Sequence, residues 1–573
     1  MISIARIILL SLLLTSCWWK PSETHLHVPL KTEVTTIDPH LAYDYISNYV
    51  THQMYDTLYT FHFLKRPYAI EPLMAESMPE LLDGGREIII KIKKGIPYHP
   101  SKYIPDGKMI TAHDFVRSFK RLAYKHTGSR AWWLAKNIFV GLDELHEKAN
   151  SLQELSSAIL PGIKAVDDYT LKLTLKRTIP PHQILNLLAM SFTAPIPEEV
   201  FTKMNNDLSN TDVGSGAYTL IELSLKNETT LKAFKGYNTS QYPNVGDRYS
   251  HDKNLILDAN KSIPFTDKVT FYVEPDDRKR WERFLKGEFS FIELPRPFVA
   301  EVLQDDGSLN KEILKKEIQI EQSPSLAFWF IEFNMTDPVL GKNKLLREAI
   351  AHSIDVKNFI WSFGHNADQQ ANSIYTPGIY GYSAARELPY KYNQEKAKEL
   401  LRKAGYPNGS GLPLIIFDTR RETDFYVEQA KFIKRELESI GFKVEIRINT
   451  FSQFIERVKN RSMSMWQGGW LLDFPDAENI LQLFYSKNSG NGGPNKSDFR
   501  NKKFDTLFEQ VIKLENNSQK LATLEKMENI INQEIPIIML YYSKNYFLYK
   551  KDIKNFRFNE LSMGFLKYVR IGN

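Results

Sequence analysis

One stretch joins an uncharged run to a carboxylate, that of Asp473: Met465-Trp466-Gln467-Gly468-Gly469-Trp470-Leu471-Leu472-Asp473-Phe474-Pro475-Asp476. Residues 463–472 carry no charge, which is typical of a buried strand, and Pro475 ends that strand. The two adjacent glycines leave the backbone unshielded where another backbone can approach. We therefore expect an α/β fold to be built around this strand.

Asp473 stands at the end of the predicted strand, where an ionised carboxylate needs a compensating cation. The nearest basic residues in the sequence are Arg461 and Lys487, which are 12 and 14 positions away. A ligand ammonium group would fill this role. A second interpretation stays open, in which Asp473 and Asp476 only shape a turn through side-chain hydrogen bonds to the backbone.

The first residues predict an export signal. Arg6 is the only charge before an apolar run from Ile7 to Leu14, which is too short to span a bilayer. Leu14-Thr15-Ser16-Cys17 follows and resembles the lipobox of bacterial lipoproteins. This resemblance implies cleavage after residue 16 and lipid attachment at Cys17. An ordinary signal peptide with an incidental cysteine stays open.

Composition excludes several classes of function. Cys17 is the only cysteine in 573 residues, so the body has no internal disulfide, cysteine-ligated zinc or cysteine nucleophile. The net charge of +6 comes from 74 basic and 68 acidic residues without a basic block, so we expect no nucleic-acid partner. After Leu14 no apolar run approaches about 18 residues, so the body is expected to be soluble. Its length predicts two or three domains.

Enzyme signatures are missing from the sequence. There is no Gly-x-Ser-x-Gly elbow, His-Glu-x-x-His motif or Walker A loop, and the histidines do not have metal-ligand spacing. We therefore predict a protein that is not an enzyme and that has no cofactor and no metal. A surface hydrolase that uses paired carboxylates such as Asp473 and Asp476 remains a minor alternative.

Strand and helix patterns alternate along most of the chain. Glu87–Lys93 and Asp168–Leu175 read as strands, and Thr111 caps a helix that runs to about Lys125. Tyr43–Thr60 has helical periodicity. The later part repeats the pattern, with strands expected at 328–333, 414–417 and 443–448 and helices at 345–353, 396–404 and 425–440. This alternation predicts strands covered by helices.

Several motifs occur together in one order. They are Ile37-Asp38-Pro39-His40, Asp106-Gly107-Lys108 with Thr111-Ala112-His113-Asp114-Phe115-Val116, Val166-Asp167-Asp168-Tyr169-Thr170-Leu171, Gly214-Ser215-Gly216-Ala217-Tyr218, Phe333-Asn334-Met335 before Leu346-Arg347-Glu348-Ala349-Ile350, and the stretch quoted first. Over almost the whole mature chain they resemble the substrate-binding lipoproteins of ABC importers, in the peptide and nickel class that includes the periplasmic oligopeptide-binding protein.

The resemblance implies a two-lobed periplasmic-binding-protein fold of type II, similar to cluster C, with an extra subdomain and a hinged cleft between the lobes. The implied order is a signal peptide over residues 1–16, a lipid-anchored linker over 17–27, the first lobe over 28–55, 182–292 and 536–573, the extra subdomain over 56–181 and the second lobe over 293–535. The chain is expected to cross between the lobes near Phe291–Pro295 and near Ile535.

The implied function is that of an extracytoplasmic solute receptor that binds oligopeptides between its lobes and delivers them to the transmembrane permease of an ABC importer. The protein is expected to be a monomer, held through Cys17 to a bacterial membrane in the periplasm or at the cell surface. In the resembled family, the motif corresponding to Trp470-Leu471-Leu472-Asp473 pairs with the ligand backbone, and its aspartate receives the α-ammonium group.

By the same resemblance, Gly468 and Gly469 belong to the ligand-binding edge. Tyr43, Tyr45 and Tyr542 are expected to border the cleft from the first lobe, and Glu293 to meet it at the hinge. For these four residues the interpretations as surface helix or core stay open.

Gln467 departs from the family pattern, because some peptide-binding relatives carry a basic residue three positions before the tryptophan to hold a ligand carboxylate. This departure leaves the anchoring of a peptide carboxyl terminus open. It also leaves open a non-peptide ligand, such as a metal chelate or a modified amino-acid compound.

Overall fold

The computed structural model describes residues 23–572 apart from residues 106, 305, 365–366 and 491–492. The predicted signal peptide and the predicted lipid attachment at Cys17 lie outside these residues. Within the described part of the chain, no helix has the length and hydropathy needed to cross a membrane.

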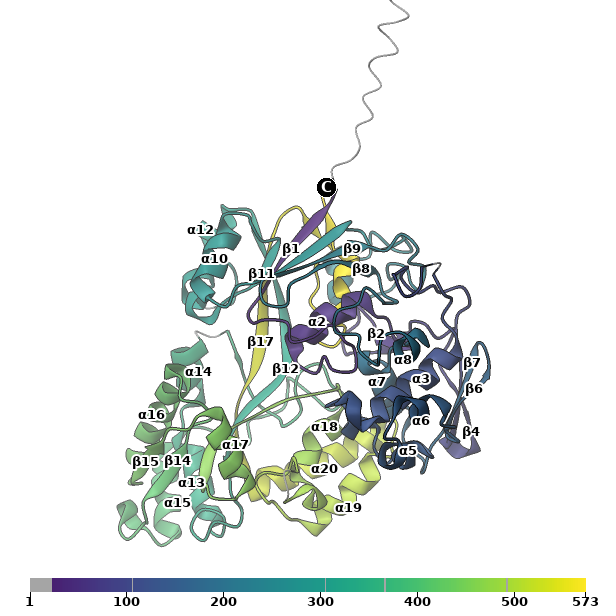
Figure 1. Cartoon of the computed structure of the whole chain (residues 1–573). Coiled ribbons are helices and arrows are strands. Elements are labelled where there is room, and N and C mark those ends of the chain that lie inside the picture. The colour runs from purple at the N-terminus through teal and green to yellow at the C-terminus, as the bar shows by residue number, and fades with distance from the viewer. Residues whose placement is uncertain (1–22, 106, 305, 365–366, 491–492, 573) are drawn as a thin grey trace, which may run out of the picture.

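Two long antiparallel strands connect the parts of the molecule. They are β12 (Ile318–Phe333) and β17 (Ile537–Lys550), and they pair along most of their length with a shift in register between Pro324 and Phe328. A strand of 16 residues is about 50 Å long, and Figure 1 shows both strands running from the upper part of the molecule to the lower part. The pair is therefore the common support of both lobes.

The sheet around these two strands has the order β11-β17-β12-β16-β14-β15, with β13 on β17. Its other strands are β11 (Phe291–Glu293), β13 (Gln369–Gln370), β14 (Ile415–Asp418), β15 (Val444–Arg447) and β16 (Met465–Leu471). The predicted strand at 463–472 is β16. The strand expected at 328–333 is longer than predicted, because pairing with β17 extends β12 back to Ile318.

A four-stranded sheet with the order β1-β10-β9-β8 forms the centre of the first lobe. Its strands are β1 (His25–Leu30), β10 (Lys268–Val273), β9 (Glu228–Ala233) and β8 (Tyr218–Leu223). Helix α2 (Tyr45–Met54) packs beside it and is shorter than the predicted 43–60, because Tyr55 takes an extended conformation and Tyr59–Phe61 form strand β2 against β3 (Ile70–Pro72). The C-terminal residues 547–569 share this hydrophobic core, together with β18 (Ile553–Lys554) and β19 (Arg570–Ile571).

A separate core belongs to the subdomain, whose sheet has the order β4-β5-β7-β6. The strands are β4 (Glu80–Leu82), β5 (Glu87–Lys91), β7 (Thr170–Thr174) and β6 (Ile163–Asp167), and the helices are α3 (Ala112–Ala123), α4 (Trp132–Ala135), α5 (Leu142–Lys148), α6 (Leu152–Ser157), α7 (Pro181–Leu188) and α8 (Glu199–Thr202). Thr111 and Asp114 form the predicted capping box of α3. Its apolar face, with Phe115 and Phe119, is buried.

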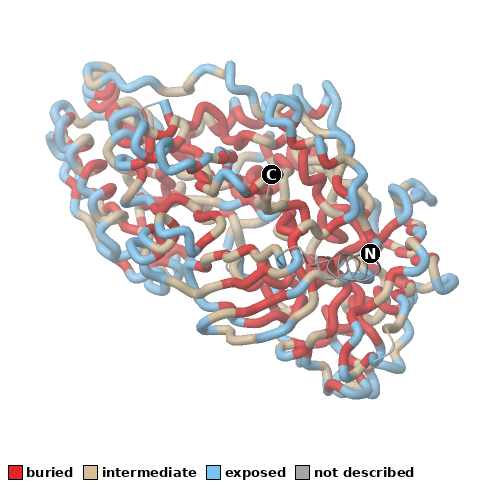
Figure 2. Tube along the Cα trace, turned by 90° about the horizontal axis from the view of Figure 1, so that it is seen from above, coloured by how far each residue is buried: buried red, intermediate tan, exposed pale blue. Residues whose placement is uncertain are grey.

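Helices cover β14, β15 and β16 in the second lobe. They are α13 (Lys344–Ser353), α14 (Val356–Gly364), α15 (Gln394–Lys403), α16 (Asp424–Glu438) and α17 (Phe451–Lys459), followed by α18 (Ala477–Leu481), α19 (Lys502–Val511) and α20 (Ser518–Glu534). Two hydrophobic cores lie here, one shared by α13, α15 and α16 and one by α18, α19 and α20. Figure 2, seen from above, shows buried segments throughout both ends of the molecule.

A small core connects α10 (Asp277–Leu285) with α11 (Val299–Val302) and α12 (Lys311–Leu314), and it also contains Ile318 of β12. Figure 1 places α10 and α12 together in the upper part of the molecule. From this core the chain continues along β12 toward the second lobe, and the crossing expected near Phe291–Pro295 stays a prediction. The domain boundaries themselves stay a prediction.

The motif Ile37-Asp38-Pro39-His40 joins the first lobe to the subdomain. The Asp38 carboxylate accepts hydrogen bonds from both terminal nitrogens of Arg121 in α3, at 2.6 and 2.5 Å, and both side chains are fully buried. Bidentate pairing of this kind is stronger than a single neutral hydrogen bond. The pair therefore fixes α3 against the segment that leads into α2.

Candidate functional site

Strand β16 has one edge that is only partly paired. On one side it pairs with β12 along its whole length, from Met465 opposite Phe333 to Leu471 opposite Ala327. On the other side β14 pairs only with Met465 and Trp466. Among the described residues, no strand lies beside Gly468–Leu471 on this second edge. An exposed strand edge of this kind can accept an extended chain through main-chain hydrogen bonds.

Leu471 and Gly469 direct their backbone N–H and C=O groups toward this open edge, whereas the backbone of Leu472 points to β12. The Leu472 N–H donates to the carbonyl of Leu326 in β12 at 3.3 Å. Because pairing alternates along antiparallel strands, Leu471 and Gly469 point their N–H and C=O groups to the opposite side. The Gly469 carbonyl accepts a hydrogen bond there from the Arg420 guanidinium, at 3.3 Å.

The two glycines are required by the aromatic side chains of β12. A Cβ atom at Gly468 would lie 2.4 Å from the Phe330 ring, and one at Gly469 would lie 2.5 Å from the Trp329 ring. The rings therefore fill the side-chain space on both faces of β16. What remains accessible at this point is the edge of the strand.

Asp473 follows the open edge directly. Its side chain is exposed, and its Oδ2 accepts a hydrogen bond from Asn479 Nδ2 at 3.4 Å, while Asn479 Oδ1 accepts from the Trp470 indole at 2.7 Å. Desolvation by the surrounding protein raises the pKa of the Asp473 carboxyl, and the bond from Asn479 lowers it. Among the described residues, no Lys, Arg or His nitrogen lies within 4 Å of this carboxylate. Asp473 is thus an anion that has no cation beside it.

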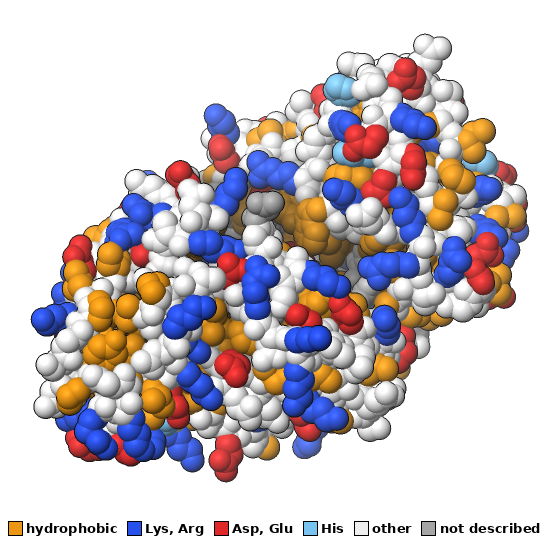
Figure 3. All heavy atoms as spheres, turned by 90° about the horizontal axis from the view of Figure 1, so that it is seen from below, with side chains coloured by type: hydrophobic (Ala, Val, Ile, Leu, Met, Phe, Trp, Pro, Cys, Tyr) orange, Lys and Arg blue, Asp and Glu red, His pale blue; other side chains and the backbone are white. Residues whose placement is uncertain are grey.

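Tyr43 of the first lobe lies just before α2. Its hydroxyl accepts a hydrogen bond from the Trp133 indole of the subdomain at 3.2 Å. Burial and, to a smaller extent, the charge of Asp473 raise the pKa of Tyr43, whereas the bond from Trp133 lowers it. The charge of Asp473 therefore acts on the Tyr43 hydroxyl. Figure 3 shows the molecule from below, with a hollow that has hydrophobic side chains inside it and Lys and Arg side chains along its rim.

Arg420 is a site residue that the sequence interpretation missed. It lies just after β14, and its guanidinium is within 6 Å of the Trp329, Phe451 and Phe454 ring centroids. Desolvation lowers the pKa of Arg420, and within the described chain no carboxylate oxygen lies within 4 Å of it. In the sequence, Arg420 is about 50 residues from β16 and is marked only by its position after a predicted strand. The pairing of β14 with β16 is what brings it to the site.

The other predicted residues lie in three different environments. Gln467 is buried, accepts a hydrogen bond from the Arg420 N–H at 3.0 Å and donates one to the Tyr426 carbonyl at 2.9 Å, so it holds the segment after β14. Tyr542 is 1% exposed, and its hydroxyl accepts a hydrogen bond from the Ser373 N–H at 3.0 Å, so the structure places it in the core.

Tyr45 and Glu293 come together away from β16. Both line a cavity of about 240 Å³ between α2, β1 and β11, and Lys31 Nζ lies 2.6 Å from a Glu293 oxygen. Burial, followed by the charge of Glu293, raises the pKa of Tyr45 well above its ordinary value. These two residues therefore form a cluster of their own, apart from Asp473 and Tyr43.

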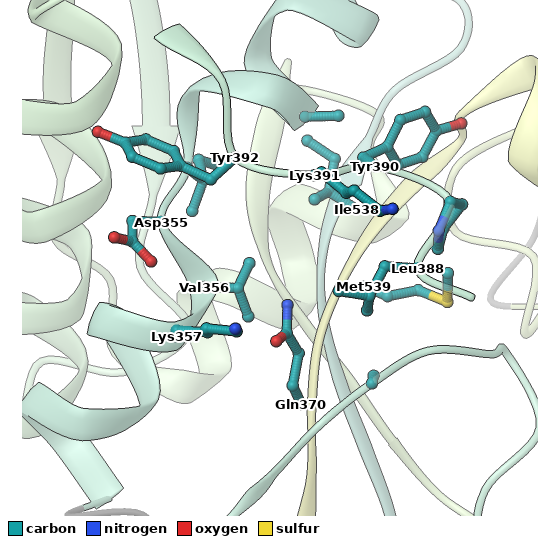
Figure 4. A pocket seen from close by; sticks show the side chains of 14 residues that line it. Asp355, Val356, Lys357, Gln370, Leu388, Tyr390, Lys391, Tyr392, Ile538 and Met539 are labelled. Carbon is teal, nitrogen blue, oxygen red and sulfur yellow. The ribbon is translucent and has the colours of Figure 1, made fainter. Parts of the chain in front are cut away.

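A further cavity of about 420 Å³ lies in the second lobe between the start of α14 and strands β13 and β17 (Figure 4). Tyr390 and Tyr392 line it from the segment before α15, Lys357 from α14, Gln370 from β13 and Met539 from β17. None of the predicted site residues lines it. It is therefore separate from the open edge of β16.

Helix α7 of the subdomain contacts α18 of the second lobe next to Asp473. Gln183 Nε2 donates to Glu478, and His182 Nε2 lies 3.6 Å from Asp476, which also pairs with Lys520 at 3.0 Å. One ligand atom from each of His182, Asp476 and Glu478 lies within 4.8 Å of the others, as a metal site needs. The Lys520 ammonium already supplies the positive charge at Asp476, so this carboxylate is paired without a metal.

The contact between α7 and α18 predicts a stability that depends on pH. Burial and the nearby Asp476 raise the pKa of Glu478 to about 7, while Gln183, Lys520 and Arg177 act against this shift. A carboxyl group with a raised pKa in the folded state contributes stability that is present at low pH and is lost as the pH rises from about 4.5 to 7. We expect Glu478→Gln to raise the free energy of unfolding at pH 7.5 by about 1 to 2 kcal/mol. At pH 5 the variant and the wild type should unfold alike.

Thermal unfolding of both proteins at the two pH values measures this difference. Glu509→Gln is a control for a surface carboxylate that is paired with Lys487 at 2.7 Å. An equal effect of Glu478→Gln at both pH values would contradict the titration of Glu478.

Comparison with known proteins adds a family and a fold. Residues 69–492 match the model of the bacterial extracellular solute-binding proteins, family 5. The Heme-binding protein A of Haemophilus influenzae is 25% identical over 87% of this chain and 83% of its own length. The Dipeptide-binding protein of Escherichia coli is 22% identical, over 87% and 86% of the two chains.

Solved structures with similar folds cover almost the whole chain. The periplasmic binding protein DppA of Helicobacter pylori, in complex with the peptide STSA, superposes with a TM-score of 0.70 at 23% identity and covers 96% of this chain and 98% of its own. HbpA2 of Haemophilus parasuis gives a TM-score of 0.76 at 20% identity, over 96% and 100% of the two chains. These likenesses confirm the predicted two-lobed α/β fold of type II.

Proposed function

We propose that this chain, which belongs to the bacterial extracellular solute-binding proteins of family 5, captures short peptides between its lobes and delivers them to the permease of an ABC importer. The observation that carries the proposal is the open edge of β16 with an unpaired anion at one end, Asp473, and a cation on it, Arg420. A peptide supplies the missing partner at each point, and its backbone pairs with the edge.

The chemistry of the edge matches a zwitterionic chain. The Asp473 carboxylate receives the α-ammonium group through a charge-assisted hydrogen bond, and the Arg420 guanidinium receives the terminal carboxylate in its fork. Between them, the backbone groups of Leu471 and Gly469 pair with the peptide backbone, which makes binding insensitive to side chains. In this proposal Arg420 anchors the carboxyl terminus of the peptide, the role for which Gln467 carries no charge.

The spacing of the two charges favours a short ligand. Gly469, where Arg420 binds, and Asp473 are four residues apart, which is about 13 Å along a strand. An extended peptide advances about 3.3 to 3.6 Å per residue. Because both side chains also reach toward the ligand, we infer a length of about two to four residues.

The remaining features belong to the same proposal. Tyr43 and Trp133 close over the ammonium end, and the exclusion of water strengthens the charge-assisted bonds. The protein acts as a monomeric receptor without catalysing a reaction, and lipid attachment at Cys17 holds it outside the cytoplasm beside the permease. The similarity to a dipeptide-binding protein supports a peptide as the ligand. The similarity to a heme-binding protein is the reason that a non-peptide solute is the alternative.

Native mass spectrometry of the soluble body from Trp18 onward, followed by denaturation, tests the proposal. We expect a set of co-purified masses that correspond to short peptides. Addition of such peptides to the emptied protein should raise its unfolding temperature. A single non-peptide mass, or an emptied protein that no short peptide stabilises, would replace the peptide by another solute.

A further inference from the structure

A second cation, Lys496, lies beside the same strand. Its ammonium nitrogen is 5.9 Å from the centroid of the Trp470 ring, and its side chain is half-buried. Among the described residues, no carboxylate oxygen lies within 4 Å of this nitrogen and no hydrogen bond satisfies it. Desolvation lowers the pKa of Lys496, and the charge of Arg420 lowers it further, whereas Glu332 raises it. Lys496 and Arg420 therefore act on the same small region of β16.

Glu332 is the carboxylate that affects Lys496 most, but it does not pair with it. Its side chain is 6% exposed and accepts a hydrogen bond from the Trp466 indole at 2.9 Å. Burial raises the pKa of Glu332 to about 7, so near neutral pH much of it is uncharged. The region around Gly468 thus has two cations and one partly neutral carboxyl group.

A peptide whose only charges are its two termini does not neutralise every charge in this region. Its ammonium group matches Asp473, and its terminal carboxylate matches Arg420, so Lys496 still has no anion. A desolvated charge without a partner is costly, and a ligand anion removes that cost. Side chains of a chain paired with β16 alternate between the two faces of the sheet, and one face carries Trp466 and Trp470 with Lys496 above.

We propose that Lys496 forms a subsite for an acidic side chain of the solute, so that this receptor prefers short peptides that contain Asp or Glu. The inference rests on the proposed function and names the substrate class within it. It also assigns Lys496 a specificity role that the backbone-pairing edge does not provide.

Isothermal titration of tripeptides tests this subsite. Trialanine is compared with peptides in which one position carries Glu or the uncharged Gln of the same shape. We expect the Glu peptide to bind about tenfold more tightly than the Gln peptide at one position. Lys496→Met should remove this ratio while changing the affinity for the Gln peptide by less than about twofold, and Lys496→Arg should keep the ratio.

Lys487→Met is the matched control, because Lys487 is exposed and pairs with Glu509 away from the site. It should leave the ratio intact. The subsite is ruled out if wild type shows no preference for Glu at any position, or if the preference survives Lys496→Met. If trialanine binds the wild type but the Glu peptide is not preferred, or is still preferred by Lys496→Met, only the subsite fails. If no tripeptide binds the wild type, the peptide function itself fails, and the subsite with it.

Discussion

Asp473→Asn is expected to weaken the binding of a short peptide by about 2 to 5 kcal/mol, the range for removing one partner of an enclosed charge pair. The amide keeps the shape of the side chain and can still accept the bond from Asn479, so the change isolates the negative charge. Titration calorimetry with trialanine at pH 7.5 measures the loss. The effect should appear mainly as faster dissociation.

A peptide with an acetylated amino terminus is the matched ligand control, because it has no ammonium group to lose. It should bind wild type and Asp473→Asn with equal, weak affinity. Binding of the unmodified peptide should also fall as the pH drops, because protonation of Asp473 removes the same charge. Since the pKa of Asp473 is raised, this loss begins at a higher pH than for an ordinary aspartate. An unchanged affinity in the variant would remove the ammonium assignment.

The local pattern was enough to predict the central strand. The uncharged run, the paired glycines and the following proline gave β16, and the alternation of strands and helices gave the α/β class. Both depend on short-range rules of periodicity and turn chemistry. The end of α2 was missed, because Tyr43–Thr60 has one continuous helical period and only the pairing of β2 with β3 breaks it.

The candidate site was only partly predictable, because exposure and pairing are tertiary properties. The sequence predicts the same place at the cleft for Tyr43 and Tyr542, yet Tyr43 is 41% exposed and Tyr542 lies in the core. Arg420 becomes a neighbour of Gly469 because β14 runs parallel to β16 and stops pairing after Trp466. No sequence spacing within one segment carries that information. The roles assigned to all these residues stay predictions until binding is measured.

Arg420→Met is expected to weaken binding of a peptide with a free carboxyl terminus by about 2 to 5 kcal/mol, because it removes the cation while keeping an apolar stem against Trp329 and Phe451. Arg420→Lys should restore only part of the affinity, because a lysine cannot offer the planar fork that binds a carboxylate through two bonds. Arg421→Met is the protein control, since Arg421 is the exposed neighbour over the same Phe451 ring.

Arg420 can act in two ways, and the peptide amide separates them. If its guanidinium binds the ligand carboxylate, wild type should lose affinity when the peptide carries a terminal amide, and Arg420→Met should bind acid and amide alike. If Arg420 instead only positions the edge through its bond to the Gly469 carbonyl, the variant should weaken both peptides by the same factor. Equal weakening would therefore remove the carboxylate assignment while leaving β16 as the edge that binds the peptide backbone.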